Sequence, residues 1–454
     1  MTTAAADREL VGHLQALIRF RTVNPPGDEL AIARHLAAVL GAEGIEHELY
    51  DTAPNRAAVV ARLRGRGRGG PLLLVAHTDV VGVEAERWTV DPFAGEVRDG
   101  WLYGRGAIDD KGMLAVNLQT MLLLKRRVVD RGLPLERDVV LVATPDEEAG
   151  SDWGLGWLLA HHPDVLAAEW AINEGGRVRV VDGRPLYAAV QTAEKVPNLL
   201  ALVCEGPSGH AAVPLPDNVL LRLGRALAAV GAHVEPLRLG PTTETFFRLL
   251  AGVWPDPAMA AAMADLTSGD DARRATGERR LRAEPSLDAV LRTGISPVRV
   301  AGGVRDNVIP AEATALLNVR TLPGESLDEV AARLGAAIGD PRVRVTIVER
   351  GETAPSSPVD GAPYQALAAS LVALEPSLTV VPYLSTGATD NACLRRAGIA
   401  TYGILPFPLA PEDEARMHGH DERVSLDALA FGLRVVAGAV ARLAGPETVE
   451  SLIP

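Results

Sequence analysis

The chain has 454 residues, of which 47% are hydrophobic, and 58 acidic against 45 basic residues give a formal net charge of −13. This length exceeds what one hydrophobic core normally organises, so two or more domains are expected. The acidic excess argues against nucleic acid or an anionic membrane as a partner.

The N-terminus lacks the basic start and apolar run of a signal peptide. No stretch of about 18 consecutive apolar residues is present, so no membrane span is expected. Cys204 and Cys393 lie far apart and form no metal-binding CxxC pattern, so both are expected to be reduced thiols. A cytoplasmic protein is the expectation.

The first part of the chain alternates helices with apolar strands. Apolar spacing predicts helices over residues 7–20 and 29–41. The apolar runs 71–76 and 138–143 are typical of strands buried on both faces, and a long helix is predicted between them at 112–128. This alternation favours an open α/β fold with a mostly parallel sheet.

The pattern changes near residue 192. The segments that follow read, in order, as strand 198–206, helix 217–230, strands 297–301 and 312–320, helix 326–339 and strand 343–349. This order is that of a small α+β sandwich. We therefore predict a larger domain in two parts, 1–191 and 355–454, with a smaller domain inserted at 192–354. Residues 241–292 are expected to be helical, without an assignable role.

Polar clusters follow three of the predicted strands at the point where each strand ends. His77-Thr78-Asp79 follows the first apolar run, Asp146-Glu147-Glu148 follows the second, and Glu174 follows a third strand near 169–172. In an open α/β sheet the carboxyl ends of the strands line the ligand crevice. These three clusters are therefore expected to converge.

Histidine nitrogen and carboxylate oxygen together suit a zinc site. His77, Glu148 and Glu174 offer such atoms. Asp79 is placed to accept the second ring N–H of His77 and fix its tautomer. Each cluster taken alone has an ordinary alternative, a capped turn for His-x-Asp and a solvated loop for Glu-Glu, so the prediction depends on their convergence.

Four sequence blocks resemble one metallopeptidase family. They are WLYGRGAIDDKGM (101–113), ATPDEEAGS (143–151), AINEGG (171–176) and MHGHDERV (417–424). The family includes aminoacylase, carboxypeptidase S, glutamate carboxypeptidase, acetylornithine deacetylase and succinyl-diaminopimelate desuccinylase. The resemblance spans residues 10 to 445 and implies a zinc-peptidase catalytic domain with an inserted lid and dimerisation domain.

The resemblance also implies a role for each matched residue. Two zinc ions per subunit are expected, with cobalt or manganese accepted by the same kind of ligand set. The implied metal ligands are His77, Asp109 (bridging both ions), Glu148, Glu174 and His418. Glu147 would be the general base, with Asp79 assisting at His77. Asp109 is preferred over Asp110, and His418 over His420, by their spacing within the blocks.

Further matches lie in the inserted domain and just after it. SGHAAVP (208–214) implies that His210 reaches the partner subunit's active site in a homodimer. The segment 302–320 implies that Asn307 lies near the substrate and that Arg320 binds its carboxylate, although this chain has Asn318 where the family often has Asp. The loop 385–395 supplies Gly387 and Thr389 as expected substrate contacts.

These features predict an amidohydrolase acting on N-acyl amino acids or short peptides that bear a free carboxylate. A dipeptidase or an acetylornithine deacetylase-like enzyme is an alternative with the same chemistry. A metal-free homologue that binds without turnover is a second alternative. A dinucleotide-binding oxidoreductase is disfavoured because no GxGxxG follows a predicted strand.

Overall fold

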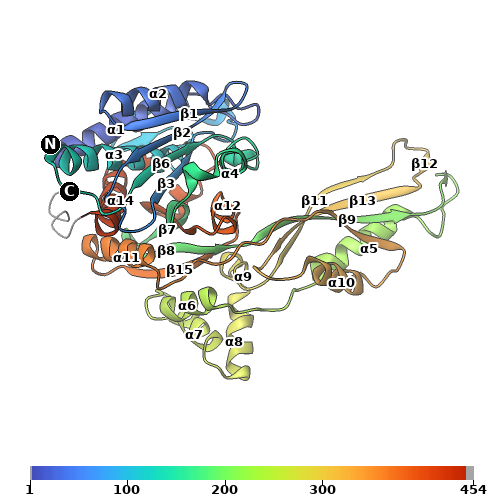
Figure 1. Ribbon diagram of the computed structural model, residues 1–454. Helices are drawn as coiled ribbons and strands as arrows, with labels where there is room; N and C mark the ends of the chain where they lie inside the picture. Colours follow the sequence, from blue (N-terminus) through green and yellow to red (C-terminus); the bar gives the residue numbers. More distant parts are fainter. Residues whose placement is uncertain (1–2, 446–454) are drawn as a thin grey trace. The chain divides into compact units, whose positions relative to one another are not determined.

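The computed structural model describes residues 3–445, and these divide into two compact units (Figure 1). The first, called the catalytic unit after the role expected for it, comprises the described residues up to Thr192, then Ser356–Tyr383 and those from Thr389 onward. The inserted unit comprises Ala193–Pro355 and Leu384–Ala388. The boundaries predicted at 191/192 and 354/355 fall one residue from these. The short segment Leu384–Ala388 was expected in the catalytic part, but Leu384 packs with Ala193 and Leu322.

An eight-stranded sheet forms the centre of the catalytic unit. In spatial order its strands are β1 (Glu46–Ala53), β2 (Arg56–Leu63), β6 (Val139–Thr144), β3 (Leu72–His77), β7 (Trp170–Val181), β16 (Ala400–Leu409), β8 (Arg184–Glu194) and β15 (Thr379–Ser385). The four central strands β6, β3, β7 and β16 run parallel, while β1 and β2 extend the sheet antiparallel at one edge. The predicted α/β fold with a parallel sheet is confirmed in this centre.

Helices cover both faces of this sheet. They are α1 (Thr3–Ile18), α2 (Leu30–Ala42), α3 (Lys111–Arg127), α4 (Leu155–His161), α11 (Ala362–Leu374), α12 (Asn391–Arg396), α13 (Pro411–Glu414) and α14 (Leu426–Ala444). Short 3-10 turns occur at Ala85–Arg87, Val129–Arg131, Glu147–Ala149 and Pro163–Leu166. A small separate sheet has the order β17 (Arg423–Ser425), β5 (Trp101–Tyr103), β4 (Glu96–Arg98).

Alternation along β6 shows why the unit has three layers. Val139, Leu141 and Ala143 pack into the larger core with α1, α2, α3 and α14, while Val140 and Val142 pack into a second core with α4 and α12. Successive strand residues point to opposite faces, so a continuous apolar run requires a helical layer on each side. The helix α3 is buried along Lys111–Leu124, and this explains its lack of a polar face.

The inserted unit is built on an antiparallel sheet of four strands. Their order is β11 (Gly294–Gly302), β13 (Glu312–Thr321), β9 (Val196–Glu205) and β14 (Val343–Glu349). Two helices, α5 (Val219–Ala232) and α10 (Leu327–Ile338), pack on one face of it (Figure 1). The two-residue strands β10 (Gly209–His210) and β12 (Val308–Ile309) pair with each other.

The region of residues 241–292 is helical, as predicted. Its helices are α6 (Pro241–Leu250), α7 (Pro257–Leu266), α8 (Asp271–Leu281) and α9 (Pro285–Asp288). Helices α7 and α8 approach closely at Gly277, where an added Cβ would lie 2.4 Å from the carbonyl oxygen of Ala262. A side chain at this position would force the two helices apart. No helix among residues 3–445 has the length and apolar character needed to cross a membrane.

Candidate metal centre

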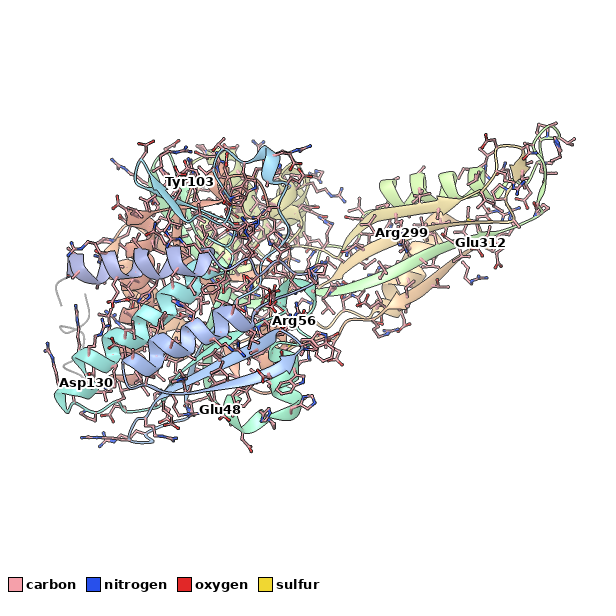
Figure 2. All side chains as sticks on the ribbon, turned by 90° about the horizontal axis from the view of Figure 1, so that it is seen from above. Glu48, Arg56, Tyr103, Asp130, Arg299 and Glu312 are labelled. Carbon is pink, nitrogen blue, oxygen red and sulfur yellow. The ribbon has the colours of Figure 1, made fainter. Side chains whose placement is uncertain are left out.

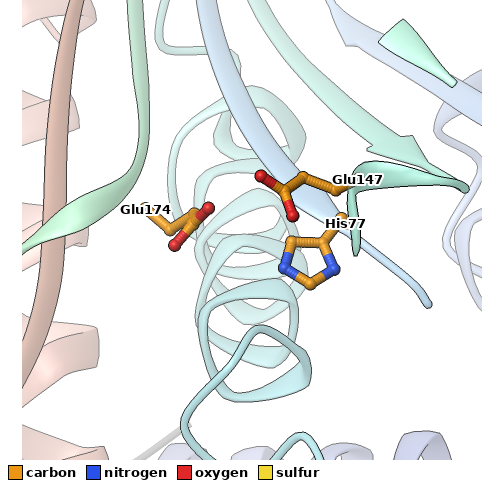
Figure 3. Close-up of side chains that lie close together, drawn as sticks. All are labelled: His77, Glu147 and Glu174. Atoms are coloured by element: carbon orange, nitrogen blue, oxygen red, sulfur yellow. The ribbon is translucent and has the colours of Figure 1, made fainter. Parts of the chain in front are cut away.

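The polar clusters predicted at three strand ends do converge. His77 is the last residue of β3 and pairs with Thr144, the last residue of β6. Glu147 follows β6 in a short turn, and Glu174 lies on β7, the other neighbour of β3. In Figure 3 the side chains of His77, Glu147 and Glu174 point toward one another.

Asp109 lies between the two histidines that the sequence assigns to different metal sites. Its Oδ1 is 3.1 Å from Nε2 of His77, and its Oδ2 is 3.0 Å from Nε2 of His418. Nε2 of His418 is also 3.2 Å from Oε1 of Glu148. One carboxylate therefore presents one oxygen to each histidine, which is the arrangement a bridging ligand needs.

The ligand atoms form two overlapping groups. One atom each of His77, Glu147 and Glu174 lie within 4.8 Å of one another, and so do one atom each of His77, Asp109 and Glu148. Imidazole nitrogen with carboxylate oxygen is a donor set that zinc accepts. The residues present therefore fit the expected divalent ions.

The acidic groups of the site are crowded, and their pKa values reflect this. Burial raises the pKa of Glu147 and of Glu174, and the neighbouring carboxylates raise both further. Hydrogen bonds to Asp109 and Glu148 raise the pKa of His418 to about 10. Burial alone would raise the pKa of Asp109, but the two histidines outweigh it and hold that pKa below its usual range. Carboxylates crowded in this way remain ionised together only beside strong positive charge.

Asp79 positions both the first histidine and the acidic turn. It is fully buried, its backbone oxygen lies 3.0 Å from Nδ1 of His77, and its Oδ1 lies 3.4 Å from the same nitrogen. Its carboxylate accepts hydrogen bonds from the backbone N–H groups of Glu147 (3.1 Å) and Glu148 (3.0 Å). The predicted interaction with the imidazole is therefore accompanied by a second one, with the turn that carries the base.

Glu422, for which the sequence suggested no role, supports the loop of Asp109. It is buried, and its Oε1 accepts from the backbone N–H groups of Ile108 (2.8 Å) and Asp109 (3.1 Å). Its Oε2 accepts from Gly106 N (3.0 Å) and pairs with Arg105 at 2.6 Å. Glu422 therefore fixes the loop that presents Asp109. Its position four residues after His418 is the signal that points to it.

Asn391 has a similar supporting role at Glu174. Its Nδ2 donates to the backbone oxygen of Glu174 at 2.8 Å and to Oε1 of Gln191 at 3.1 Å. Asn391 lies within the segment 385–395 that the sequence assigned to substrate binding. In the structure it holds the backbone of a candidate ligand, a role that the sequence did not suggest.

None of the contacts described above involves Thr389, Gly387 or the disfavoured His420. His420 faces Glu84, with 3.7 Å between Nε2 and Oε2. Oγ1 of Thr389 accepts from the backbone N–H of Asn391. Gly387 belongs to the inserted unit, where its N–H donates to Ser385 Oγ.

Three candidates lie in the inserted unit, and only Arg320 is on its four-stranded sheet. His210 and Asn307 are exposed and close to each other, because Ala211 N donates to the backbone oxygen of Asn307 and His210 pairs with Val308. Arg320 lies near the far end of β13, where Nε donates to Oδ1 of Asn318 at 3.0 Å. Burial lowers the pKa of Arg320. The roles of all three remain predictions.

Comparison with known proteins gives consistent matches along the chain. The sequence profile described as Peptidase family M20/M25/M40 matches residues 73–442. The human N-fatty-acyl-amino acid synthase/hydrolase PM20D1 is 29% identical over 368 residues, which cover 79% of this chain and 71% of that protein. Human aminoacylase-1 is 26% identical over 414 residues, covering 90% of this chain and 88% of that protein.

Among solved structures, the fold is similar to that of an M20 family metallo-carboxypeptidase from Sulfolobus solfataricus. The TM-score is 0.70 at 18% identity, and the match covers 95% of this chain and 98% of the other. At this identity the likeness concerns the fold.

Proposed function

The chain belongs to peptidase family M20/M25/M40, and we propose that it is a dinuclear metal-dependent amidohydrolase acting on N-acyl amino acids or short peptides with a free carboxylate. The observation that carries this proposal is the placement of Asp109 between His77 and His418, with a further carboxylate, Glu147, beside the first histidine. The similar relatives named as an aminoacylase and an N-fatty-acyl-amino acid hydrolase favour the N-acyl amino acid class.

Five residues would hold the two ions. His77 and Glu174 would bind the first, Glu148 and His418 the second, and Asp109 both. When bound, two such ions polarise the substrate carbonyl and make a water molecule more acidic. The mixed imidazole and carboxylate set favours zinc, and cobalt or manganese also suits it.

Glu147 would move the proton during hydrolysis. It takes a proton from the water whose oxygen bonds to the carbonyl carbon, and it returns that proton to the nitrogen as the carbon–nitrogen bond breaks. The products are a carboxylic acid and a free amine. Burial, with Asp390, Asp109 and Glu148 nearby, raises the pKa of Glu147, which favours holding the proton between these two steps.

Substrate recognition would come largely from the inserted unit. A planar guanidinium suits bidentate binding of a carboxylate, and this is the role proposed for Arg320. His210 would donate a hydrogen bond to the oxyanion as it forms. Asn307, Gly387 and Thr389 would contact the rest of the substrate.

The geometry of β13 supports a homodimer as the active species. His210 pairs with Val308 of β12, which precedes the start of β13, and Arg320 lies near the end of β13; Figure 1 shows where β12 and β13 lie. At about 3.3 Å per residue, the ten residues of this strand span roughly 30 Å. A substrate of amino-acid size does not bridge that distance, so His210 of one subunit and Arg320 of the same subunit would serve different active sites.

The edge strand β11 offers a surface for the second copy. Among the described residues it pairs with β13 alone, and its residues from Ser296 to Gly302 are exposed. Val298 and Val300 are 59% and 58% exposed. An exposed apolar edge strand is a template for pairing with another chain, and a second copy of this chain would close it.

The first experiment measures metal content per subunit together with hydrolysis of N-acetyl-methionine before and after chelation. Two zinc-like ions and release of methionine that chelation abolishes are expected. Glu147→Gln should keep both ions and lower kcat by about 10²–10⁴-fold. Glu84→Gln is the control, because Glu84 is exposed and contacts only His420 and Arg87 among the ion pairs described. Full activity of Glu147→Gln would refute the assigned base.

A mixing experiment tests the role of His210. His210→Ala and Glu147→Gln homodimers should each be inactive, and subunit exchange between them should restore part of the activity. In a mixed dimer, one site combines an intact Glu147 with the intact His210 of the partner. If mixing restores nothing although exchange is demonstrated, His210 does not act across the dimer.

A further inference from the structure

Arg56 lies outside every sequence block and yet contacts the turn that carries the acidic pair. It is the first residue of β2 and is 5% exposed (labelled in Figure 2). Its NH1 pairs with Oδ1 of Asp146, and its NH2 lies 3.2 Å from Oε1 of Glu29. Asp146 immediately precedes Glu147 and Glu148. Arg56 therefore acts one residue away from the proposed base.

The backbone of Asp146 adopts a conformation that needs support. Its φ of 73° lies in the left-handed region, which non-glycine residues rarely adopt. The side chain of Asp146 also accepts from the backbone N–H of Trp153 at 2.9 Å and from Nδ2 of Asn24 at 3.0 Å. Contacts on both carboxylate oxygens thus hold the residue in this conformation.

Asn24 connects this support to Asp79. Its Nδ2 donates to Oδ2 of Asp79 at 2.9 Å as well as to Asp146. Asp79 in turn accepts from the backbone N–H groups of Glu147 and Glu148. The turn is therefore held from two sides by two carboxylates that share one amide group.

Arg56 supplies the positive charge that this arrangement requires. Glu29 and Asp146 are 0% and 3% exposed, and a buried carboxylate is stable in its ionised form only when it is paired. The chain at Gly27 is also shaped around the guanidinium, because a Cβ there would lie 1.6 Å from NH2 of Arg56. The guanidinium of Arg56 occupies the space that a side chain at position 27 would need, and glycine leaves this space open.

We propose that Arg56 is a positioning residue: with Asp146 and Asn24, it fixes the turn that sets Glu147 and Glu148 relative to His77. The inference rests on the proposed function for the roles of those two glutamates. The alternative is an ion pair that only stabilises the fold. The two differ because a positioning residue affects the metal affinity and the turnover of the folded protein.

The test compares Arg56→Met with Arg62→Met. Arg62 lies on the same strand and pairs with Asp138 at 2.7 Å, away from the acidic turn. Loss of a group that orients a metal ligand typically lowers metal affinity or activity by about 10–100-fold. Arg56→Met should therefore lower the affinity for one of the two ions, and kcat, by about that factor, with KM nearly unchanged. Arg62→Met should change neither.

Asp146→Asn and the double variant make the test specific. If Arg56 acts through Asp146, the losses in metal affinity should be far from additive, and Arg56→Lys should restore part of the loss because an ammonium pairs with one carboxylate. Circular dichroism identifies the folded fraction. Folded Arg56→Met with wild-type metal affinity, or additive losses, would overturn the proposal. If Arg56→Met does not fold, Arg56→Lys decides by the same criteria.

Failure of the proposed function would give a different experimental result from failure of the positioning role. A wild-type protein that binds two ions but hydrolyses no N-acyl amino acid or peptide would refute the proposed activity. The comparison of metal affinities between Arg56→Met and Arg62→Met would still support or overturn the positioning role.

Discussion

The two units present their candidate residues in different ways. In the catalytic unit, His77, Asp109, Glu148 and His418 come from separate segments and meet within hydrogen-bonding distance. In the inserted unit, His210 lies beyond the start of β13 and Arg320 lies near its end. Parallel strands bring their ends to one edge of a sheet, whereas a long antiparallel strand separates whatever stands at its two ends. One unit therefore gathers its candidate residues into one cluster, whereas the candidates of the other unit stay apart.

Removing Glu422 should have the largest effect on stability. Glu422→Ala leaves Arg105 buried and unpaired, and loss of one partner from a buried ion pair costs about 3–5 kcal/mol. Chemical denaturation of the catalytic unit would measure it. Glu205→Ala in the inserted unit is the control, because Glu205 and Arg344 form an exposed pair worth about 0–1 kcal/mol. If both variants lost a similar free energy of unfolding, this would contradict the importance given to the buried pair of Arg105 and Glu422.

Metal binding should stabilise only one of the two units. A free ion concentration of about 100 times Kd is expected to add about 2.7 kcal/mol to the stability of the unit that binds it. Hydrogen exchange should slow in β3 and β6, whose ends carry or precede the proposed ligands, and stay unchanged in β9 and β13. Equal protection of both sheets on adding zinc would show that the ions bind elsewhere.

Changing the edge of the inserted sheet should affect assembly and leave the metal centre intact. Val300→Lys is expected to raise the dimer dissociation constant by about tenfold, which corresponds to about 1.4 kcal/mol. Analytical ultracentrifugation would measure this. Val348 is 55% exposed on β14, the other edge strand, so Val348→Lys is the matched control. If Val348→Lys dissociates the dimer and Val300→Lys does not, the interface lies at β14.

The smallest expected effect is a difference in pH dependence. Burial lowers the pKa of His13 and His35 below 6.5, so the unfolded chain takes up these protons first and the catalytic unit loses stability as the pH falls through that value. Burial also lowers the pKa of Lys195 from 10.5 to about 8. By the same rule the inserted unit gains stability as the pH rises from 8 toward 10.5.

Denaturation at several pH values would separate these two dependences. The double variant His13→Asn/His35→Phe should flatten the acidic dependence, and Lys195→Met should flatten the alkaline one. An acidic dependence that is unchanged in the double variant would assign it to other groups.

Much of the catalytic unit was predictable from local pattern. The run 71–76 and, after Asp138, the run 139–143 are apolar throughout, and only a strand between two helical layers buries every residue of such a run. They correspond to β3 and β6, and the ligands that follow them converge because parallel strands end together. The strands β15 and β16 were not predicted, and the strand near 169–172 extends to Val181 in the structure. The position of such strands is set by pairing with strands distant in sequence, as β16 pairs with β7.

The sequence by itself determined the family blocks, the candidate ligand residues and the α/β character of the larger unit, because spacing and residue chemistry are local properties. Only the tertiary structure showed that Glu422 holds the loop of Asp109, that Asn391 holds the backbone of Glu174 and that Arg56 reaches Asp146. These contacts join residues 90 to 313 positions apart. No spacing rule relates such residues, since only the packed sheet and its loops bring a buried charge to its partner.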